Sequence, residues 1–149
     1  MEQLNNSHGT RGRSLEYAIK QLFKSYESRG IFCQQNFPET LGDGTRIHNH
    51  GFDFLILYNG KFYAFDAKES NSPNWSLANA KLHQLKALTD VEKNGGIAFF
   101  MVYFKNEKEL RKMTPQVITN AIEQGRKSLK ITDGEKININ FLGIKNENN

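Results

Sequence analysis

Two aspartates and a lysine, Asp53, Asp66 and Lys68, border two apolar and aromatic runs in the segment from Gly51 to Lys68. Asp53 precedes the first apolar run, and Asp66-Ala67-Lys68 ends the second. Carboxylate oxygens suit Mg²⁺, which usually binds one or two carboxylates and keeps waters that a phosphate substrate can replace. A lysine beside such a site adds a cation near developing negative charge. These residue types therefore point to metal-dependent chemistry on a phosphate.

The dipeptide Asn59-Gly60 separates the two apolar runs and predicts a β-hairpin, because a two-residue type I′ turn needs positive φ at both central residues. If the residues on either side of this turn pair in order, Asp53 lies opposite Asp66. Directly opposed residues share a face, with Cβ atoms about 5 Å apart, and Lys68 points to that same face. Both strand faces are apolar, so the hairpin is expected inside a sheet rather than at its edge.

Two carboxylates opposed on an apolar hairpin repel each other and destabilise the sheet. A shared proton, the Lys68 ammonium or a bound metal ion would offset this repulsion. The alternative is that Asp53 and Asp66 are exposed, solvated charges at strand ends. The opposed geometry favours the metal site over this alternative.

A zinc site is a second metal centre that the residue types allow, with ligands drawn from Cys33, His48, His50 and His83. No CxxC or HxxxH spacing supports it. We expect the loop histidines to make polar contacts and Cys33 to be a small buried hydrophobe rather than a nucleophile. Trp75 is expected to pack at a helix start rather than to stack on a base.

Apolar periodicity and turn residues define the elements that must position these side chains. The predicted elements are, in chain order, a helix from Ser14 to Ser28, a strand from Ile31 to Phe37, a polar Gly-rich loop from Glu39 to His50, the hairpin, a helix from Ser76 to Lys93, a buried strand from Ile97 to Phe104, a helix from Pro115 to Leu129 and a last strand from Lys136 to Ile144. The order α-β-β-β-α-β-α-β predicts a mixed sheet with helices on it.

The chain has 149 residues, with 20 Lys+Arg against 16 Asp+Glu and a formal net charge of +4. This length predicts a single domain over residues 1–149, with flexible ends at 1–9 and 146–149. The basic balance is a weak indication of a polyanionic partner such as nucleic acid.

The composition also excludes several classes of protein. The longest apolar run is too short to span a bilayer, and the first residues lack the apolar core of a signal peptide. A lone cysteine excludes an intrachain disulfide. We therefore expect a cytoplasmic protein without a membrane segment.

Several short motifs carry a resemblance to known nucleases. Asp53 followed by Asp66-Ala67-Lys68 on the neighbouring strand resembles the PD-(D/E)XK nuclease signature. Three further motifs resemble RecU-type Holliday junction resolvases: Arg11-Gly12-x-Ser-Leu-Glu16, the pair His83-Gln84, and Gly95-Gly96 before an apolar strand. The similarity runs from Arg11 to Phe104 with the motifs in the same order.

The resemblance implies an α/β, restriction-endonuclease-like three-layer core, with a mixed β-sheet flanked by helices. It implies a homodimer that hydrolyses phosphodiester bonds of branched DNA with Mg²⁺, for which Mn²⁺ can substitute. Asp53 and Asp66 would be the metal carboxylates, Ala67 would lend its backbone carbonyl, and Glu16 would complete the acidic cluster. Lys68 would orient or activate the attacking water.

The same resemblance implies supporting roles for residues outside the hairpin. Gln84 would support the site from its helix, and its alternative is a polar boundary residue. Arg11 and Arg13, beside the start of the first helix, are candidate contacts for DNA phosphates. Their alternative is a pair of solvated charges.

Two features depart from the RecU pattern. The segment from Glu39 to His50 has twelve residues, where that family carries a long stalk that projects into the junction centre. Flaps or duplex DNA are therefore alternative substrates, and a non-catalytic protein that binds DNA structures in recombination is an alternative class. Asp66 stands where RecU enzymes usually have Glu, although the wider nuclease signature allows either acid.

Overall fold

The computed structural model describes residues 14–37, 39–48 and 51–145. The expected flexible ends at 1–9 and 146–149, the candidate DNA contacts Arg11 and Arg13, and His50 lie outside the described residues. None of the helices within the described ranges combines the length and the apolar character needed to cross a bilayer.

A six-stranded mixed sheet lies at the centre, in the order β1-β4-β5-β7-β8-β10. Its strands are β1 (Phe32–Gln35), β4 (Phe54–Tyr58), β5 (Lys61–Ser70), β7 (Ile97–Phe104), β8 (Glu109–Met113) and β10 (Glu135–Lys136). β5 and β7 run parallel, whereas the other neighbouring strands run antiparallel. The hairpin strands β4 and β5 lie inside the sheet, as their apolar faces predict.

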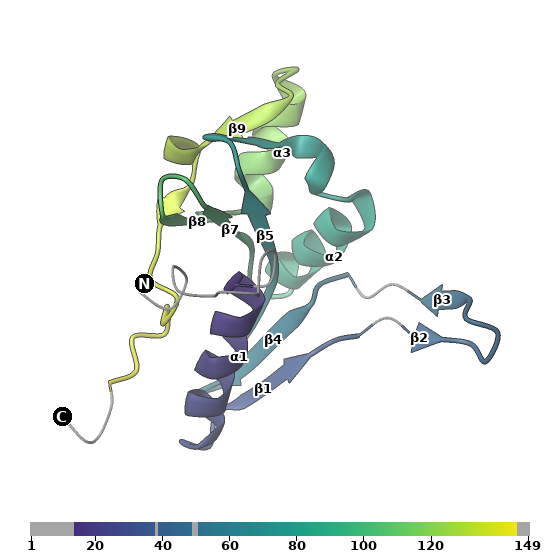
Figure 1. Cartoon of the computed structure of the whole chain (residues 1–149), viewed down its shortest axis with the longest axis vertical. Helices are drawn as coiled ribbons and strands as arrows, with labels where there is room; N and C mark the ends of the chain where they lie inside the picture. Colours follow the sequence, from purple (N-terminus) through teal and green to yellow (C-terminus); the bar gives the residue numbers. More distant parts are fainter. Residues whose placement is uncertain (1–13, 38, 49–50, 146–149) are drawn as a thin grey trace.

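Helices cover both faces of this sheet (Figure 1). α1 (Ser14–Glu27) packs on one face, where its Phe23 contacts Phe65 of β5 edge-to-face. α2 (Leu82–Lys93) and α3 (Pro115–Glu123) pack on the other, where Leu88 and Ala64 share a core. Phe65 and Ala64 point to opposite faces because successive strand side chains alternate. The predicted three-layer α/β core is confirmed.

The β4–β5 hairpin has the predicted register, from the Tyr58–Lys61 pair at the turn to the Phe54–Phe65 pair at its open end. The φ angles of Asn59 and Gly60 are both positive, at 51° and 76°, as a type I′ turn requires. The first helix and the buried strand β7 also lie where they are predicted, and the predicted strand from Ile31 to Phe37 contains the shorter β1.

The predicted loop from Glu39 to His50 contains a small antiparallel hairpin, which corrects that prediction. Its strands are β2 (Glu39–Thr40) and β3 (Arg46–His48). Strands of two and three residues are too short to show an alternating pattern in the sequence. In Figure 1 the hairpin projects away from the body of the molecule.

The predicted helix from Ser76 to Lys93 is wrong in its first part. A strand, β6 (Asn74–Ser76), and a 3-10 helix, η2 (Leu77–Asn79), precede α2. Leu82, an apolar residue within the predicted helix, is 83% exposed. Trp75 is buried as expected, but it lies in β6 opposite Leu129 of β9 (Ser128–Lys130) rather than at a helix start.

The C-terminal third differs most from the predictions. α3 ends at Glu123, and the predicted range ends within β9, at Leu129. The strand predicted from Lys136 to Ile144 is reduced to β10, and the alternating apolar side chains after it pack as an irregular segment against the core on the α1 side. β8 is missed because three of its five residues are charged, although Leu110 and Met113 are buried.

Candidate active site

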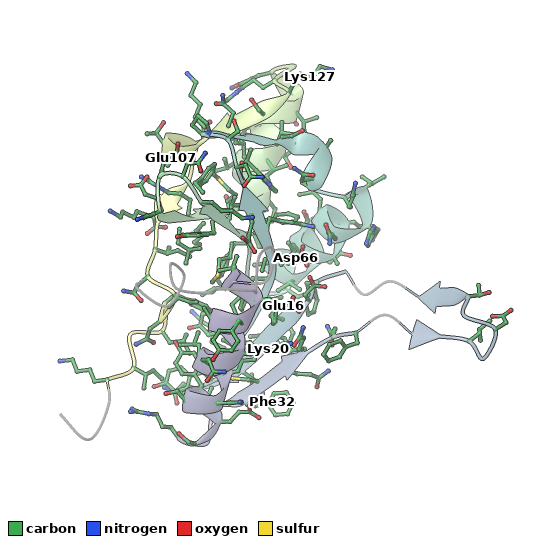
Figure 2. All side chains as sticks on the ribbon, viewed as in Figure 1. Glu16, Lys20, Phe32, Asp66, Glu107 and Lys127 are labelled. Atoms are coloured by element: carbon green, nitrogen blue, oxygen red, sulfur yellow. The ribbon has the colours of Figure 1, made fainter. Side chains whose placement is uncertain are left out.

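The candidate residues meet where β4 begins and β5 continues past it. β5 pairs with β4 as far as Phe65, so residues 66–70 have β7 as their only neighbouring strand in the described part of the sheet. A cavity of about 240 Å³ lies there, lined by Leu15, Glu16, Asp53, Phe54, Ala67, Lys68 and Glu69. Figure 2 labels Glu16 on the first turn of α1 and Asp66 on β5 in this region.

Asp66 is the buried centre of the polar contacts at this cavity. Nζ of Lys68 lies 3.0 Å from its Oδ2, and Nε2 of Gln84 donates to the same oxygen at 3.1 Å. Oδ1 of Asp66 is buried and has no hydrogen-bond partner in the described part of the chain. Leaving a buried polar atom unpaired costs about 1–3 kcal/mol, and more for a charged group. A cation bound at Oδ1 would remove this cost.

Asp53 lies against Asp66, as the hairpin register predicts. Burial above all, and then the hydrogen bond and negative charge of Asp66, raise the pKa of Asp53 from 3.8 to about 7, while Lys68 acts in the opposite direction. That hydrogen bond exists only with a proton between the two carboxylates. In the fully charged pair, Oδ1 of Asp66 is left without a partner. The pair is therefore suited to hold either a proton or a cation.

Gln84 links the start of α2 to the acid pair. Its Oε1 accepts the backbone N–H of Lys81 at 3.3 Å, while its Nε2 donates to Asp66. Because the amide oxygen is bound at the helix start, the NH₂ group faces the carboxylate. Gln84 itself is buried.

Glu16 reaches the cavity from the first turn of α1. Its Oε1 accepts a hydrogen bond from Nε2 of Gln35 at 2.8 Å. The next residue along, Asn36, donates its backbone N–H to the carbonyl of Asp53 at 2.7 Å and its Nδ2 to the carbonyl of Phe52 at 3.0 Å. No sequence pattern pointed to Gln35 and Asn36. Their hydrogen bonds join the end of β1 to α1 and to the segment before β4, and these segments are not neighbours in the sequence.

The segment that leads to Asp53 passes very close to α2. A Cβ on Gly51 would stand 2.0 Å from the Cβ of Ala87, which no side chain can occupy without movement of the backbone. The glycine therefore allows residues 51–53 to lie against the helix that also carries Gln84. The position of Gly51 directly before Phe52 and Asp53 is a sequence feature that indicates such a contact, since a glycine beside a strand often marks a close backbone approach.

Glu69 is a further cavity residue that sequence reasoning missed. It follows Lys68 on β5, and Nζ of Lys105 lies 3.3 Å from its Oε1. Oε1 of Glu69 is buried. Its contact with Lys105 is an ion pair that does not have the geometry of a hydrogen bond. Glu69 adds a carboxylate to the cavity wall on the opposite face of β5 from Lys68, because adjacent strand residues alternate.

The donor atoms fit a divalent cation held by few protein ligands. Across residues 14–37, 39–48 and 51–145, no three histidine, cysteine, aspartate or glutamate side chains are arranged as a metal-holding group. The zinc alternative thus finds no support among the described side chains, and its His83 is exposed. Mg²⁺ needs only one or two carboxylates, and Asp53 with the unpartnered oxygen of Asp66 supplies them.

The sequence matches a known family over most of its length. Residues 43–148 match the family model described as RecU, Recombination protein U. The chain is 30% identical over 142 residues to the Holliday junction resolvase RecU of Mycoplasmopsis pulmonis, which covers 90% of this chain and 88% of that protein. It is 28% identical over 121 residues to the Holliday junction resolvase RecU of Bacillus cytotoxicus, which covers 70% of this chain and 60% of that protein.

The fold is similar to that of a solved resolvase. The match is Hjc, a Holliday junction resolvase from the archaeal hyperthermophile Archaeoglobus fulgidus, with a TM-score of 0.51. The two are 13% identical, and the similarity covers 78% of this chain and 91% of that chain. At this level of identity the likeness establishes a shared fold.

Proposed function

This chain belongs to the RecU family, and we propose that it is a Holliday junction resolvase, an endonuclease that acts in DNA recombination. The observation that carries this function is the buried Asp66, which faces Asp53, is paired with Lys68 and keeps one carboxylate oxygen unpartnered. Such an arrangement at a cavity beside an open strand edge suits metal-dependent hydrolysis of a phosphodiester bond.

The proposed cofactor is Mg²⁺, with Mn²⁺ able to substitute. Its protein ligands would be Asp53, Asp66 and the backbone carbonyl of Ala67. Glu16 lines the same cavity, although it does not form a three-acid group with them in the described structure. Ala67 lines the cavity on the stretch of β5 that β4 leaves unpaired, which favours an available carbonyl. When bound, the cation stabilises negative charge on the scissile phosphate and lowers the pKa of an attacking water.

The protein's own side chains perform the remaining steps. The Lys68 ammonium has three donors, of which one reaches Asp66, and the others can hold the attacking water and a phosphate oxygen. Gln84 donates to Oδ2 of Asp66 and so holds this carboxylate in position beside Asp53. Glu16 accepts a hydrogen bond from Gln35 and lines the same cavity, where its second oxygen can accept a further one.

The proposed partners are branched DNA and a second copy of this chain. Arg11 and Arg13 precede α1, whose first turn carries Glu16, and would contact DNA phosphates. Phe32 and Leu57 are register partners on one face of the sheet and are 54% and 46% exposed. Paired exposed apolar residues favour an interface, and a two-fold dimer would present two sites to a symmetric substrate.

The short β2–β3 hairpin favours a second candidate substrate. A hairpin of this length reaches less far into a junction than a long stalk does. Flap or duplex DNA is therefore the alternative substrate to a four-way junction. The test is cleavage of a four-way junction, a flap and a matched linear duplex, each with Mg²⁺, Mn²⁺ or EDTA. If either cation supports faster cleavage of the junction than of the duplex, the result supports the resolvase. Binding of all three without cation-dependent cleavage would identify a non-catalytic DNA-binding protein instead.

The dimer is tested separately by sedimentation at micromolar concentration. Substitution Leu57→Asp places a charge on the exposed apolar pair and is expected to shift the protein toward the monomer. A dimer that persists unchanged in this variant places the interface elsewhere.

A further inference from the structure

We infer that the polar segment Gln34–Asn36, at the end of the edge strand β1, is a positioning element of the proposed active site. It holds the Glu16 carboxylate and the Asp53 backbone at the cavity. This inference rests on the proposed function, because it assigns the segment to the same catalytic cavity.

Gln35 acts on Glu16 through its side chain. Its Nε2 donates to Oε1 of Glu16 at 2.8 Å in a partly buried setting. An amide NH₂ group is a donor only, so this bond is made to the carboxylate and leaves its second oxygen for the cavity. Gln35 also pairs with Phe54 across β1 and β4, which fixes its position next to Asp53.

Asn36 acts on Asp53 through the two backbone carbonyls that flank it, those of Phe52 and of Asp53 itself. Its backbone N–H donates to the Asp53 carbonyl at 2.7 Å, and its Nδ2 donates to the Phe52 carbonyl at 3.0 Å. Nε2 of Gln34 donates to Oδ1 of Asn36 at 3.0 Å. This last bond engages the amide oxygen, so the Asn36 NH₂ group must face Phe52.

The three consecutive side chains therefore have a common result. Asp53 lies outside the strand ladder, because the last β4–β5 pair is at Phe54. Its backbone would therefore be loosely held without Asn36. Glu16 lies on a different element, and Gln35 is its hydrogen-bond donor at 2.8 Å. Partners that orient metal ligands typically contribute 10- to 100-fold in metal affinity or activity.

The experiment measures Mn²⁺ binding by calorimetry together with junction cleavage, on the full chain. The variant Gln35→Leu keeps the size of the side chain and removes the donor. We expect the dissociation constant for Mn²⁺ to rise about 10-fold or more, and kcat to fall while KM for the junction stays constant. Asn36→Leu is expected to act in the same direction with a smaller effect, because its backbone bond to Asp53 remains.

A matched control is Gln116→Leu on α3, which removes an exposed glutamine that donates to Asn120 at 2.8 Å. It should leave cation binding and cleavage unchanged.

The outcomes separate this inference from the proposed function. Wild-type Mn²⁺ affinity and kcat in a folded Gln35→Leu protein would overturn the positioning role. Weakened Mn²⁺ binding in Gln35→Leu, in a protein whose wild type cuts no junction, would support the positioning role and overturn the resolvase. Absence of saturable cation binding by the wild type overturns both.

Discussion

The backbone of Gly51 lies against Ala87 of α2 so closely that a Cβ on Gly51 would stand 2.0 Å from the Cβ of Ala87. Substitution Gly51→Ala must therefore push the segment before Asp53 away from the helix. Overpacking of this kind costs about 1–3 kcal/mol, and the displaced Asp53 should bind a divalent cation more weakly. Urea unfolding and calorimetric cation titration measure the two effects.

The compensating change is Ala87→Gly, which removes the Cβ that the new side chain meets. The double variant should regain cation affinity and stability, apart from about 1 kcal/mol for a glycine inside a helix. If Gly51→Ala alone behaves as the wild type, the close approach has no bearing on the site.

Substitution Asp66→Asn is expected to separate activity from stability. Loss of one carboxylate should reduce cleavage by more than the ~100-fold typical of supporting partners. The amide can still accept from Gln84 and can donate to Asp53. The like-charge repulsion also disappears, which offsets the loss of the ion pair with Lys68. The melting temperature in EDTA should therefore not fall. Retention of the full cleavage rate by this variant is the result that would contradict the proposed role.

Stability without a cation should decrease as the pH rises. Folding raises the pKa of Asp53 from 3.8 to about 7, so the folded protein holds this proton more tightly than the unfolded chain does. The stabilisation is fully present below pH ~4 and is lost as the pH rises toward ~7. Thermal unfolding in EDTA across this range measures it, and Asp53→Asn should flatten the profile.

A divalent cation should reverse this trend. The cation competes with the shared proton, so its affinity should increase as the pH rises through ~7. Binding to the folded state then stabilises the protein by mass action. A melting temperature with Mg²⁺ that follows the EDTA curve at every pH would mean that the acid pair binds no cation.

Gln84→Leu tests the link between α2 and the acid pair. The change removes a donor from Asp66 and an acceptor from the Lys81 backbone N–H. Loss of the buried bond to Asp66 should cost about 1–3 kcal/mol in the free energy of unfolding, and cation affinity should fall as well. The neighbouring His83→Leu, at an exposed position, is the control and should change neither quantity.

The central hairpin is the part of the fold that the sequence determines most fully. Asn59 and Gly60 fix the turn type, the turn fixes the register, and the register brings Asp53 to Asp66. Each step is local, so each could be predicted from neighbouring residues. The same holds for β7, whose continuous apolar run shows that both of its faces are buried.

Elements stabilised by distant partners could not be predicted in this way. The β6 strand forms because Trp75 lies opposite Leu129, and a helical pattern in the residues after Trp75 gives no sign of that partner. The residues after Lys136 alternate like a strand, yet they pack against the core without a neighbouring strand in the described structure. At the site, the Gln35–Glu16 bond joins β1 to α1, which only the tertiary structure reveals.

The edge position of β1 also has a dynamic consequence. Among the described strands, β4 is the only neighbour of β1 in the sheet, and outer elements open locally at a lower free energy than global unfolding requires. Such an opening would withdraw Gln35 and Asn36 from Glu16 and Asp53 while the inner strands stay paired. The hydrogen bonds that hold Glu16 and the Asp53 backbone would thus be lost whenever this outer strand opens. Amide hydrogens of β1 should consequently exchange with solvent more slowly once a cation fills the cavity.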